Sequence, residues 1–291
     1  MTGESETDLP PSQFVAPERV LIEMAEAGAK RACGLRAHQV LVLSVMAGGF
    51  ITIGALFSTL IATGTDNEGV QRLLEGFGFS VGFFLVVLSG ALLFTEVNVE
   101  LPATLLGKRR DRLGLPPLRT AILKLWLLAA IGNMIGAFVL GQVIVYVSDY
   151  GAGFEALLDE VMSTKMRFQD VGGAEGFFQA VLSGVVANWL VGMAAFLATM
   201  GRTIIGKYIP VLITVMAFVA GGFLHAPANM AYLSLSQPLG YGPGWGDGLL
   251  WSVLPAAIGN IIGAFFLVAL PFYIAGNRQV PDETDDGHVP A

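Results

Sequence analysis

The sequence predicts an all-α protein that crosses a membrane six times, and three observations lead to that prediction. Of 291 residues, 54% are hydrophobic and 13% are charged, whereas soluble domains carry about 25% charged residues. Six hydrophobic units follow one another, and each is long enough for a crossing, which needs roughly 20 apolar residues. A short repeat also relates the second half of the chain to the first.

The region before the first hydrophobic unit divides into two parts. Residues 1–16 are acidic and lack the basic and apolar stretches of a signal peptide, so we expect a disordered tail. Residues 17–36 alternate apolar and charged positions at helical spacing. This pattern predicts an amphipathic helix, either on the membrane interface or packed on a neighbouring helix. We expect residues 37–275 to form a six-helix transmembrane channel domain and residues 276–291 to form a C-terminal tail.

Two of the six hydrophobic units are interrupted. One runs over 79–95 and resumes to about 107, and the other runs over 208–224 and resumes over 227–237. Within a bilayer, irregular backbone is tolerated only where it is buried in protein or lines a wet cavity. We therefore expect the functional site at these two breaks. The remaining four units are continuous: 38–63, 121–147, 176–200 and 248–274.

The basic residues predict the orientation of the chain. Thirteen of the 16 lysines and arginines fall in the N-terminal region, the 107–124 and 201–207 loops and the C-terminal end. Because basic loops stay in the cytoplasm, both termini are predicted to be cytoplasmic. The exceptions, in the opposite loops, are Arg72, Lys165 and Arg167.

An eight-residue motif occurs twice. Residues 131–138 read IGNMIGAF and residues 258–265 read IGNIIGAF, identical at seven positions and 127 residues apart. Because the copies lie three units apart, they predict a 3+3 inverted repeat with units 2 and 5 broken. The spacing places Gly132, Gly136, Gly259 and Gly263 on faces suited to close helix packing. Asn133 and Asn260 lie beside those faces, where they either bind another helix or line a pore.

The motifs around the breaks resemble those of the formate/nitrite transporter family over about residues 17–275. They are Phe79-Ser-Val-Gly-Phe83, Leu93-Phe94-Thr95, Ala187-Asn188-Trp189 and Phe218 to Asn229, in that order. The resemblance implies an aquaporin-like fold, a pentamer with one pore per subunit, and a location in the bacterial inner membrane. It implies transport of a small monovalent solute such as formate, nitrite, hydrosulfide or lactate, without enzymatic activity. Lipid, the permeant solute and sister subunits are the expected partners, with no cofactor, metal or nucleic acid.

The resemblance also assigns roles to individual residues. It makes His225 the central group, with Thr95 and Asn188 as polar neighbours. Apolar constrictions admit a neutral acid more readily than its anion, and a histidine between them can supply charge or a proton. Each assignment has a structural alternative: a hydrogen-bonded core histidine, packed aromatics, and a threonine that caps a helix. The resemblance further implies that Phe79, Phe83 and Phe218, with Leu93 and Phe94 nearby, form the constrictions.

The sequence departs from the family pattern at positions that bear on selectivity. Leu224 and Ala226 flank His225 where the family commonly has glutamate and serine. Family members commonly have a lysine 16 residues before the asparagine of the fourth helix. In this sequence that asparagine corresponds to Asn188, and the residue 16 positions before it is Gly172. These departures suggest a divergent, YfdC-like branch.

Two glutamates define a second hypothesis for the function. Glu96 and Glu100 are four residues apart and share a helix face. They either pair with the Arg109 region or a neighbouring subunit, or make a vestibule that favours cations or neutral solutes. The alternative function is therefore a channel of the same fold for a neutral solute or small cation. A third possibility, a scaffold or enzyme, lacks any catalytic triad, metal cluster or nucleotide-binding motif in the sequence.

Overall fold

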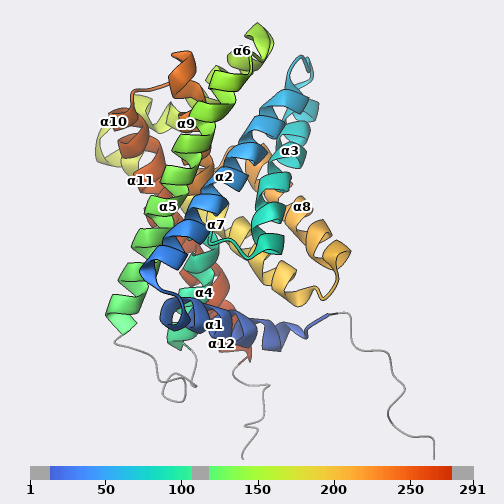
Figure 1. The fold of residues 1–291 in the computed structure, drawn as a ribbon, viewed down its shortest axis with the longest axis vertical. Coiled ribbons are helices and arrows are strands. Elements are labelled where there is room, and N and C mark those ends of the chain that lie inside the picture. The colour runs from blue at the N-terminus through green and yellow to red at the C-terminus, as the bar shows by residue number, and fades with distance from the viewer. Residues whose placement is uncertain (1–13, 107–117, 277–291) are drawn as a thin grey trace, which may run out of the picture.

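The computed structural model describes residues 14–106 and 118–276, which form helices and connecting segments with no strand among them (Figure 1). Three sequence expectations lie outside the described residues in whole or in large part: the disordered N-terminal tail, the basic loop around Arg109 and the C-terminal tail. Figure 1 shows α1 and α12 at one end of the helical bundle and α6 at the other. We call these the α1 end and the α6 end.

The first half of the bundle contains one long helix pair and one interrupted path. α2 (Ala37–Ala62) and α5 (Leu118–Val147) are continuous, as the sequence predicts. α3 (Glu68–Ser89) begins eleven residues before the apolar unit expected from the sequence. Its first turns carry charged side chains, so the hydrophobic pattern did not include them. The chain then leaves the helix and re-enters one at α4 (Phe94–Leu106).

The second half follows the same order. α6 (Gly151–Val171) precedes α7 (Gly173–Met200), which is continuous. α8 (Ile204–Ala220) ends before a non-helical segment, and α9 (Ala226–Ser236) follows it. The last path contains two short stretches of wider π-helical turns between its α-helical parts. From Gln237 onward the elements are η2 (Gln237–Leu239), α10 (Trp245–Gly248), η3 (Leu249–Val253), α11 (Leu254–Gly263), η4 (Ala264–Ala269) and α12 (Leu270–Gly276). The π-helical stretches are η3 and η4.

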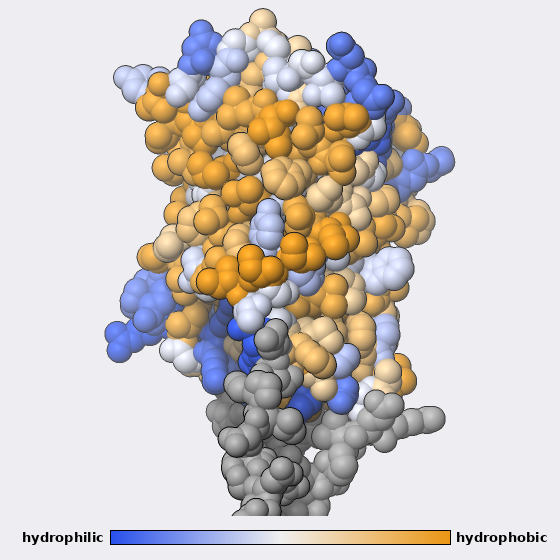
Figure 2. Space-filling model, turned by 90° about the vertical axis from the view of Figure 1, so that its right-hand side faces the viewer, coloured by the Kyte–Doolittle hydropathy of each residue, from blue (hydrophilic) through white to orange (hydrophobic). Residues whose placement is uncertain are grey.

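The outer surface of the bundle suits a lipid bilayer. Among the described residues, five helical stretches are long and apolar enough to cross a membrane. Figure 2 shows a broad hydrophobic band with polar side chains above and below it. α6 is not among the five spans. The spans are Ala37–Ala62, Glu68–Ser89, Leu123–Val147, Gly173–Met200 and Trp245–Gly276.

The repeated glycines lie where helices approach most closely. A side chain at Gly136 would overlap the carbonyl oxygen of Val45 on α2. A side chain at Gly263 would overlap the carbonyl oxygen of Val185 on α7. Gly132 faces Ser44 and Gly259 faces Val181 in the same way. All four glycines therefore lie at close helix contacts, α5 with α2 and α11 with α7.

α1 (Pro17–Gly34) packs on the bundle. At Gly28 its backbone lies so close to α4 that an added Cβ would be 2.7 Å from Thr104 Oγ1. Thr104 Oγ1 donates to the carbonyl oxygen of Ala25 at 2.9 Å, and Val15 N donates to Met200 O at 2.8 Å. Of the two placements left open by the sequence, these contacts match the helix packed on a neighbour.

Candidate functional site

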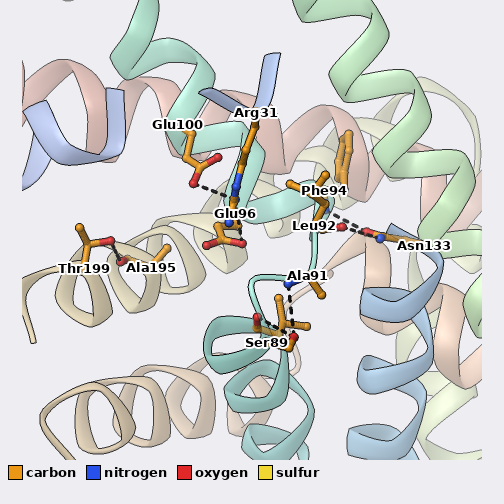
Figure 3. A network of polar contacts seen from close by, with 11 residues as sticks. Arg31, Ser89, Ala91, Leu92, Phe94, Glu96, Glu100, Asn133, Ala195 and Thr199 are labelled. Carbon is orange, nitrogen blue, oxygen red and sulfur yellow. Dashed lines mark hydrogen bonds and ion pairs between the residues drawn. The ribbon is translucent and has the colours of Figure 1, made fainter. Parts of the chain in front are cut away.

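The non-helical segment between α3 and α4 is held by Asn133 of α5. Its Oδ1 accepts a hydrogen bond from Phe94 N at 2.9 Å, and its Nδ2 donates to Leu92 O at 3.0 Å and Ser44 O at 2.8 Å (Figure 3). The side chain is fully buried. Asn133 thus satisfies backbone groups that the interrupted helix leaves unpaired.

Asn260 of α11 holds the segment between α8 and α9 in the same pattern. Its Oδ1 accepts from Ala226 N at 2.9 Å, and its Nδ2 donates to Leu224 O at 3.1 Å and Gly184 O at 2.8 Å. The repeated asparagines therefore bind other segments of the chain, the first of the two roles considered from sequence. Their amide groups are occupied by backbone.

His225 and Thr95 bring the two interruptions together. His225 Nε2 lies 2.9 Å from Thr95 Oγ1, and both side chains are buried. His225 also caps α9, because its Nδ1 accepts a hydrogen bond from Ala228 N at 3.3 Å. An accepting Nδ1 carries no proton, so Nε2 holds the proton of a neutral imidazole and donates it to Thr95. The Thr95 hydroxyl hydrogen is then free to point elsewhere.

Asn188 of α7 lies beside Thr95. Its Nδ2 donates to Asn260 O at 2.7 Å and reaches Thr95 O at 3.4 Å. Its Oδ1 is buried and has no hydrogen-bond partner among the described residues. A buried amide oxygen without a partner costs free energy unless water or a ligand donates to it. The site thus offers one free acceptor, from Asn188, close to one free donor, from Thr95.

Aromatic side chains cover this polar centre. The ring of Phe218 lies 5.2 Å from that of His225 and 5.7 Å from that of Phe79. Phe83 and Leu93 belong to the same large buried core as Phe79 and Phe218. Phe94 lies in a different cluster, with Leu224 and Ala226 of the other interruption.

A lysine lies on the α6 side of the aromatics, at a position other than the one reached by counting 16 residues back from Asn188. Lys165 Nζ is 4.9 Å from the centre of the Tyr232 ring, which stacks on Phe79. Lys165 lines one pocket with Phe79, Phe218, Tyr232 and Glu75. Counting back from Asn188 gave Gly172, but Gly172 and Gly173 have φ of 70° and 57°, so the chain turns between α6 and α7. A fixed spacing cannot be carried across that turn.

The Lys165 ammonium has no strong partner in the described part of the chain. No carboxylate oxygen lies within ion-pair distance, and the Tyr232 ring is its recorded contact. Burial, followed by the nearby Arg167 charge, lowers the pKa of Lys165 to about 7, while Glu75 acts in the opposite direction. Such a group gains stability when a small anion approaches.

The other two basic residues of this end bind backbone. Arg72 Nη1 donates to Ala220 O at 3.1 Å, and Arg167 Nη2 donates to Gly222 O at 3.0 Å. Ala220 is the last residue of α8 and Gly222 follows it, so both carbonyl groups lie at the C-terminal end of the helix, which carries partial negative charge. Arg72 and Lys165 line the same pocket, and Arg167 binds Gly222, which also lines it.

The α1 end has a different arrangement, shown in Figure 3. Arg31 Nη1 of α1 lies 2.8 Å from Glu100 Oε1 and 3.3 Å from Glu96 Oε2 on α4. Sequence reasoning placed the partner of these glutamates near Arg109 or in a neighbouring subunit. The observed partner is Arg31, because α1 packs on α4 at Gly28.

Comparison with known proteins identifies the family. The sequence model described as formate/nitrite transporter matches residues 18–274. The chain belongs to the formate/nitrite transporter family. It is 30% identical over 256 residues to the probable formate transporter of Methanothermobacter thermautotrophicus, covering 81% of this chain and 88% of that protein. It is 28% identical over 257 residues to formate channel FocA of Escherichia coli strain K12, covering 81% and 86%.

Solved structures share the fold. A pentameric formate channel with formate bound superposes with a TM-score of 0.67 at 23% identity, covering 85% of this chain and 98% of that one. An FNT family ion channel gives 0.69 at 19% identity, covering 89% and 98%. The family expected from the sequence is thereby confirmed. This member of the formate/nitrite transporter family is a multi-pass membrane transport protein and not an enzyme.

Proposed function

We propose that the chain forms a channel for a small monovalent weak acid, entering as the anion and crossing the apolar pore in protonated form. Six crossings form a 3+3 inverted repeat, in which α3 with α4 and α8 with α9 are the broken crossings. The matching asparagine contacts at the two breaks support this repeat. By analogy with the pentameric formate channel, five subunits assemble in the bacterial inner membrane, with the α1 end and both termini in the cytoplasm.

The observation that carries the proposal is the 2.9 Å contact between His225 and Thr95, covered by Phe79 and Phe218. A neutral hydrogen-bonding centre behind apolar rings excludes an ion that has lost its water, because removing a charge from water costs about 5 kcal/mol or more. The free Thr95 donor and the free Asn188 acceptor match the two oxygens of a protonated acid, one accepting and one donating. His225 acts as a neutral donor that fixes Thr95.

Lys165 gives the pore an anion-binding entrance at the α6 end. Its ammonium is buried beside the aromatic rings and has no carboxylate partner within ion-pair distance among the described residues. An arriving anion loses water there and gains the ammonium charge. Because the pKa of the permeant acid rises as its anion leaves a positively charged site for an apolar one, the anion binds a proton before it passes between the rings.

The alternative is a pore of the same fold for a neutral solute or a small cation. Two features favour it: Glu96 lies next to Thr95, and Gly172 stands at the position where the family commonly has a lysine. Arg31 binds Glu96 and Glu100, and Lys165 lies beside the constriction. Both contacts favour the weak acid.

Flux into proteoliposomes that contain the purified chain tests the proposal. We expect formate uptake that accelerates as the external pH falls and that is lost in His225→Ala, whereas His38→Ala, at the start of α2, transports normally. Uptake of no weak acid at any pH would contradict the proposal. A potassium current that disappears in Glu96→Gln would instead establish the alternative.

A further inference from the structure

At the α1 end, two carboxylates share one guanidinium. Arg31 Nη1 contacts Glu100 Oε1 at 2.8 Å and Glu96 Oε2 at 3.3 Å, so all three groups form one cluster (Figure 3). With both glutamates ionised, the cluster carries one uncompensated negative charge. That charge is enclosed, because only 5% of the Glu100 side chain and 14% of the Glu96 side chain are exposed.

Two carboxylate oxygens of the cluster accept no hydrogen bond from a described residue. They are the buried Glu100 Oε2 and Glu96 Oε2, of which Glu96 Oε2 has only its ion-pair contact of 3.3 Å with Arg31. A buried anionic oxygen without a donor is strongly unfavourable, and binding a proton removes the charge. One proton leaves the cluster neutral, as a carboxylic acid beside an arginine–carboxylate pair.

Within residues 14–106 and 118–276, the surroundings provide no other charge that compensates the cluster. Arg31 and Glu96 are the charged groups that act on Glu100. On the elements that pack on α4, Lys124 of α5 donates to Leu35 O at 2.7 Å, Tyr232 of α9 donates to Ser58, and Tyr273 belongs to α12. Burial alone lowers the pKa of Arg31, but Glu96 and Glu100 raise it above its ordinary value, so the guanidinium stays charged.

The cluster also lies in the right place to exchange protons with the pore. Glu96 directly follows Thr95, which contacts His225. The Arg31 side chain is 19% exposed, so water reaches the cluster from the α1 end. The polar centre itself holds no comparable proton source, because the contacts of His225 require a neutral imidazole.

We propose that Arg31, Glu96 and Glu100 form a proton-binding site that supplies the proton of the permeant acid at the α1 end of the pore. The carboxyl O–H bond of the cluster breaks, the O–H bond of the permeant acid forms, and the cluster is left with its second carboxylate ionised. Water then restores the proton, and the same steps run backwards for an acid that leaves. This inference rests on the proposed weak-acid function.

Infrared spectroscopy of the purified full-length chain in lipid tests the site without any permeant. We expect a protonated-carboxyl band that titrates with pH and is absent in Glu100→Gln. Glu96→Gln should remove the same band even though Glu100 remains, because one carboxylate with one guanidinium needs no proton. Glu68→Gln, at an ion pair whose glutamate side chain is 76% exposed, is the matched control and should keep it. Persistence of the band in Glu96→Gln, or its absence from the unmodified chain at every pH, overturns the proposal.

Formate flux tests the transfer of the proton. Efflux from the α1 end should fall severalfold in Glu100→Gln, for protein that still assembles as the unmodified chain does. It should stay unchanged in Glu23→Gln, which removes an ion pair between α1 and Arg202. Unchanged efflux in Glu100→Gln overturns the transfer step. If the unmodified chain moves no weak acid but shows the Glu100-dependent band, the proposed function fails and the proton site stands, so the two failures are distinguishable.

Discussion

The two ends of the proposed pore each contain a shielded cation, buried Lys165 at one end and partly buried Arg31 at the other, and they use it differently. At the α6 end, Lys165 lies over the Tyr232 ring and makes no ion pair in the described part of the chain. At the α1 end, Arg31 binds two glutamates. An unpaired buried cation attracts an anionic ligand, whereas a cation shared by two carboxylates leaves the site acidic. We infer that the α6 end binds the anion and that the α1 end exchanges protons with the acid on its own side of the pore.

The comparison assumes that the two interruptions are built alike and that only the charges differ. Asn133→Ala and Asn260→Ala test this assumption, because each leaves three buried backbone groups without partners. Each should lower the free energy of unfolding by about 4 kcal/mol. Asn67→Ala removes an exposed helix cap and should cost about 1 kcal/mol. Thermal unfolding midpoints in detergent measure all three, and a large difference between the first two would contradict a common frame.

A second test concerns Arg31 as the centre of the α1-end cluster. Arg31→Gln leaves two buried carboxylates unpaired and should cost about 3 kcal/mol of stability near neutral pH. Arg202→Gln also removes an ion pair of α1, with Glu23, but that arginine side chain is 53% exposed. Its loss should cost less than about 1 kcal/mol.

The pH dependence sharpens this second test. The Arg31→Gln deficit should shrink in acid, because protonation neutralises the carboxylates. Equal midpoint shifts for the Arg31 and Arg202 variants would mean that Arg31 only anchors α1.

A third test removes the cation of the α6 end. Lys165→Met keeps the length of the side chain and should lower initial formate uptake from that end about tenfold, the equivalent of about 1.4 kcal/mol. Lys30→Met, at an exposed position of α1, is the control. Uptake is followed with labelled formate below pH 7. Uptake unchanged in Lys165→Met would show that the anion does not bind there.

The pKa of Lys165 predicts how anion capture at the α6 end depends on pH. Because burial lowers the pKa of Lys165 to about 7, the ammonium is charged below that pH and loses its charge above it. Anion capture at the α6 end should therefore weaken as pH rises through about 7, with the pH on the other side held constant. Lys165→Met should remove this component, and an identical profile in the variant would assign it to another group.

The smallest effect is expected at Tyr232. Tyr232→Phe removes a hydrogen bond of 3.0 Å to Ser58 Oγ but keeps the ring beneath Lys165. Stability should fall by about 1 kcal/mol, with uptake nearly unchanged. Tyr232→Leu removes the ring and should lower uptake more than Tyr232→Phe. Equal uptake in both variants would argue against a role for the ring.

Much of the fold and the centre of the site could be predicted from sequence because they depend on local patterns. Helix breakers inside apolar stretches identified both interruptions, and the repeated motif singled out Asn133 and Asn260. The motif comparison also named His225 and Thr95, which lie 2.9 Å apart. These positions require particular residue types at fixed spacing within single helices, so the sequence records them directly.

The charged groups at the two ends could not be assigned in this way. Lys165 was missed because a count from Asn188 crosses the turn at Gly172 and Gly173. Arg31 was missed because its partners lie on α4, 65 and 69 positions along the chain, and only the packing of α1 at Gly28 joins them. Both pairings depend on tertiary contacts, and no periodicity in the sequence reports those.

The most direct measurement of this division between the ends is an anomalous difference map from crystals of the full-length chain soaked with iodide and, separately, with rubidium. The account predicts iodide density beside Lys165, near Phe79 and Phe218, and no iodide at Arg31. Iodide bound at Arg31 with none at Lys165, or rubidium bound between Glu96 and Glu100, would contradict it.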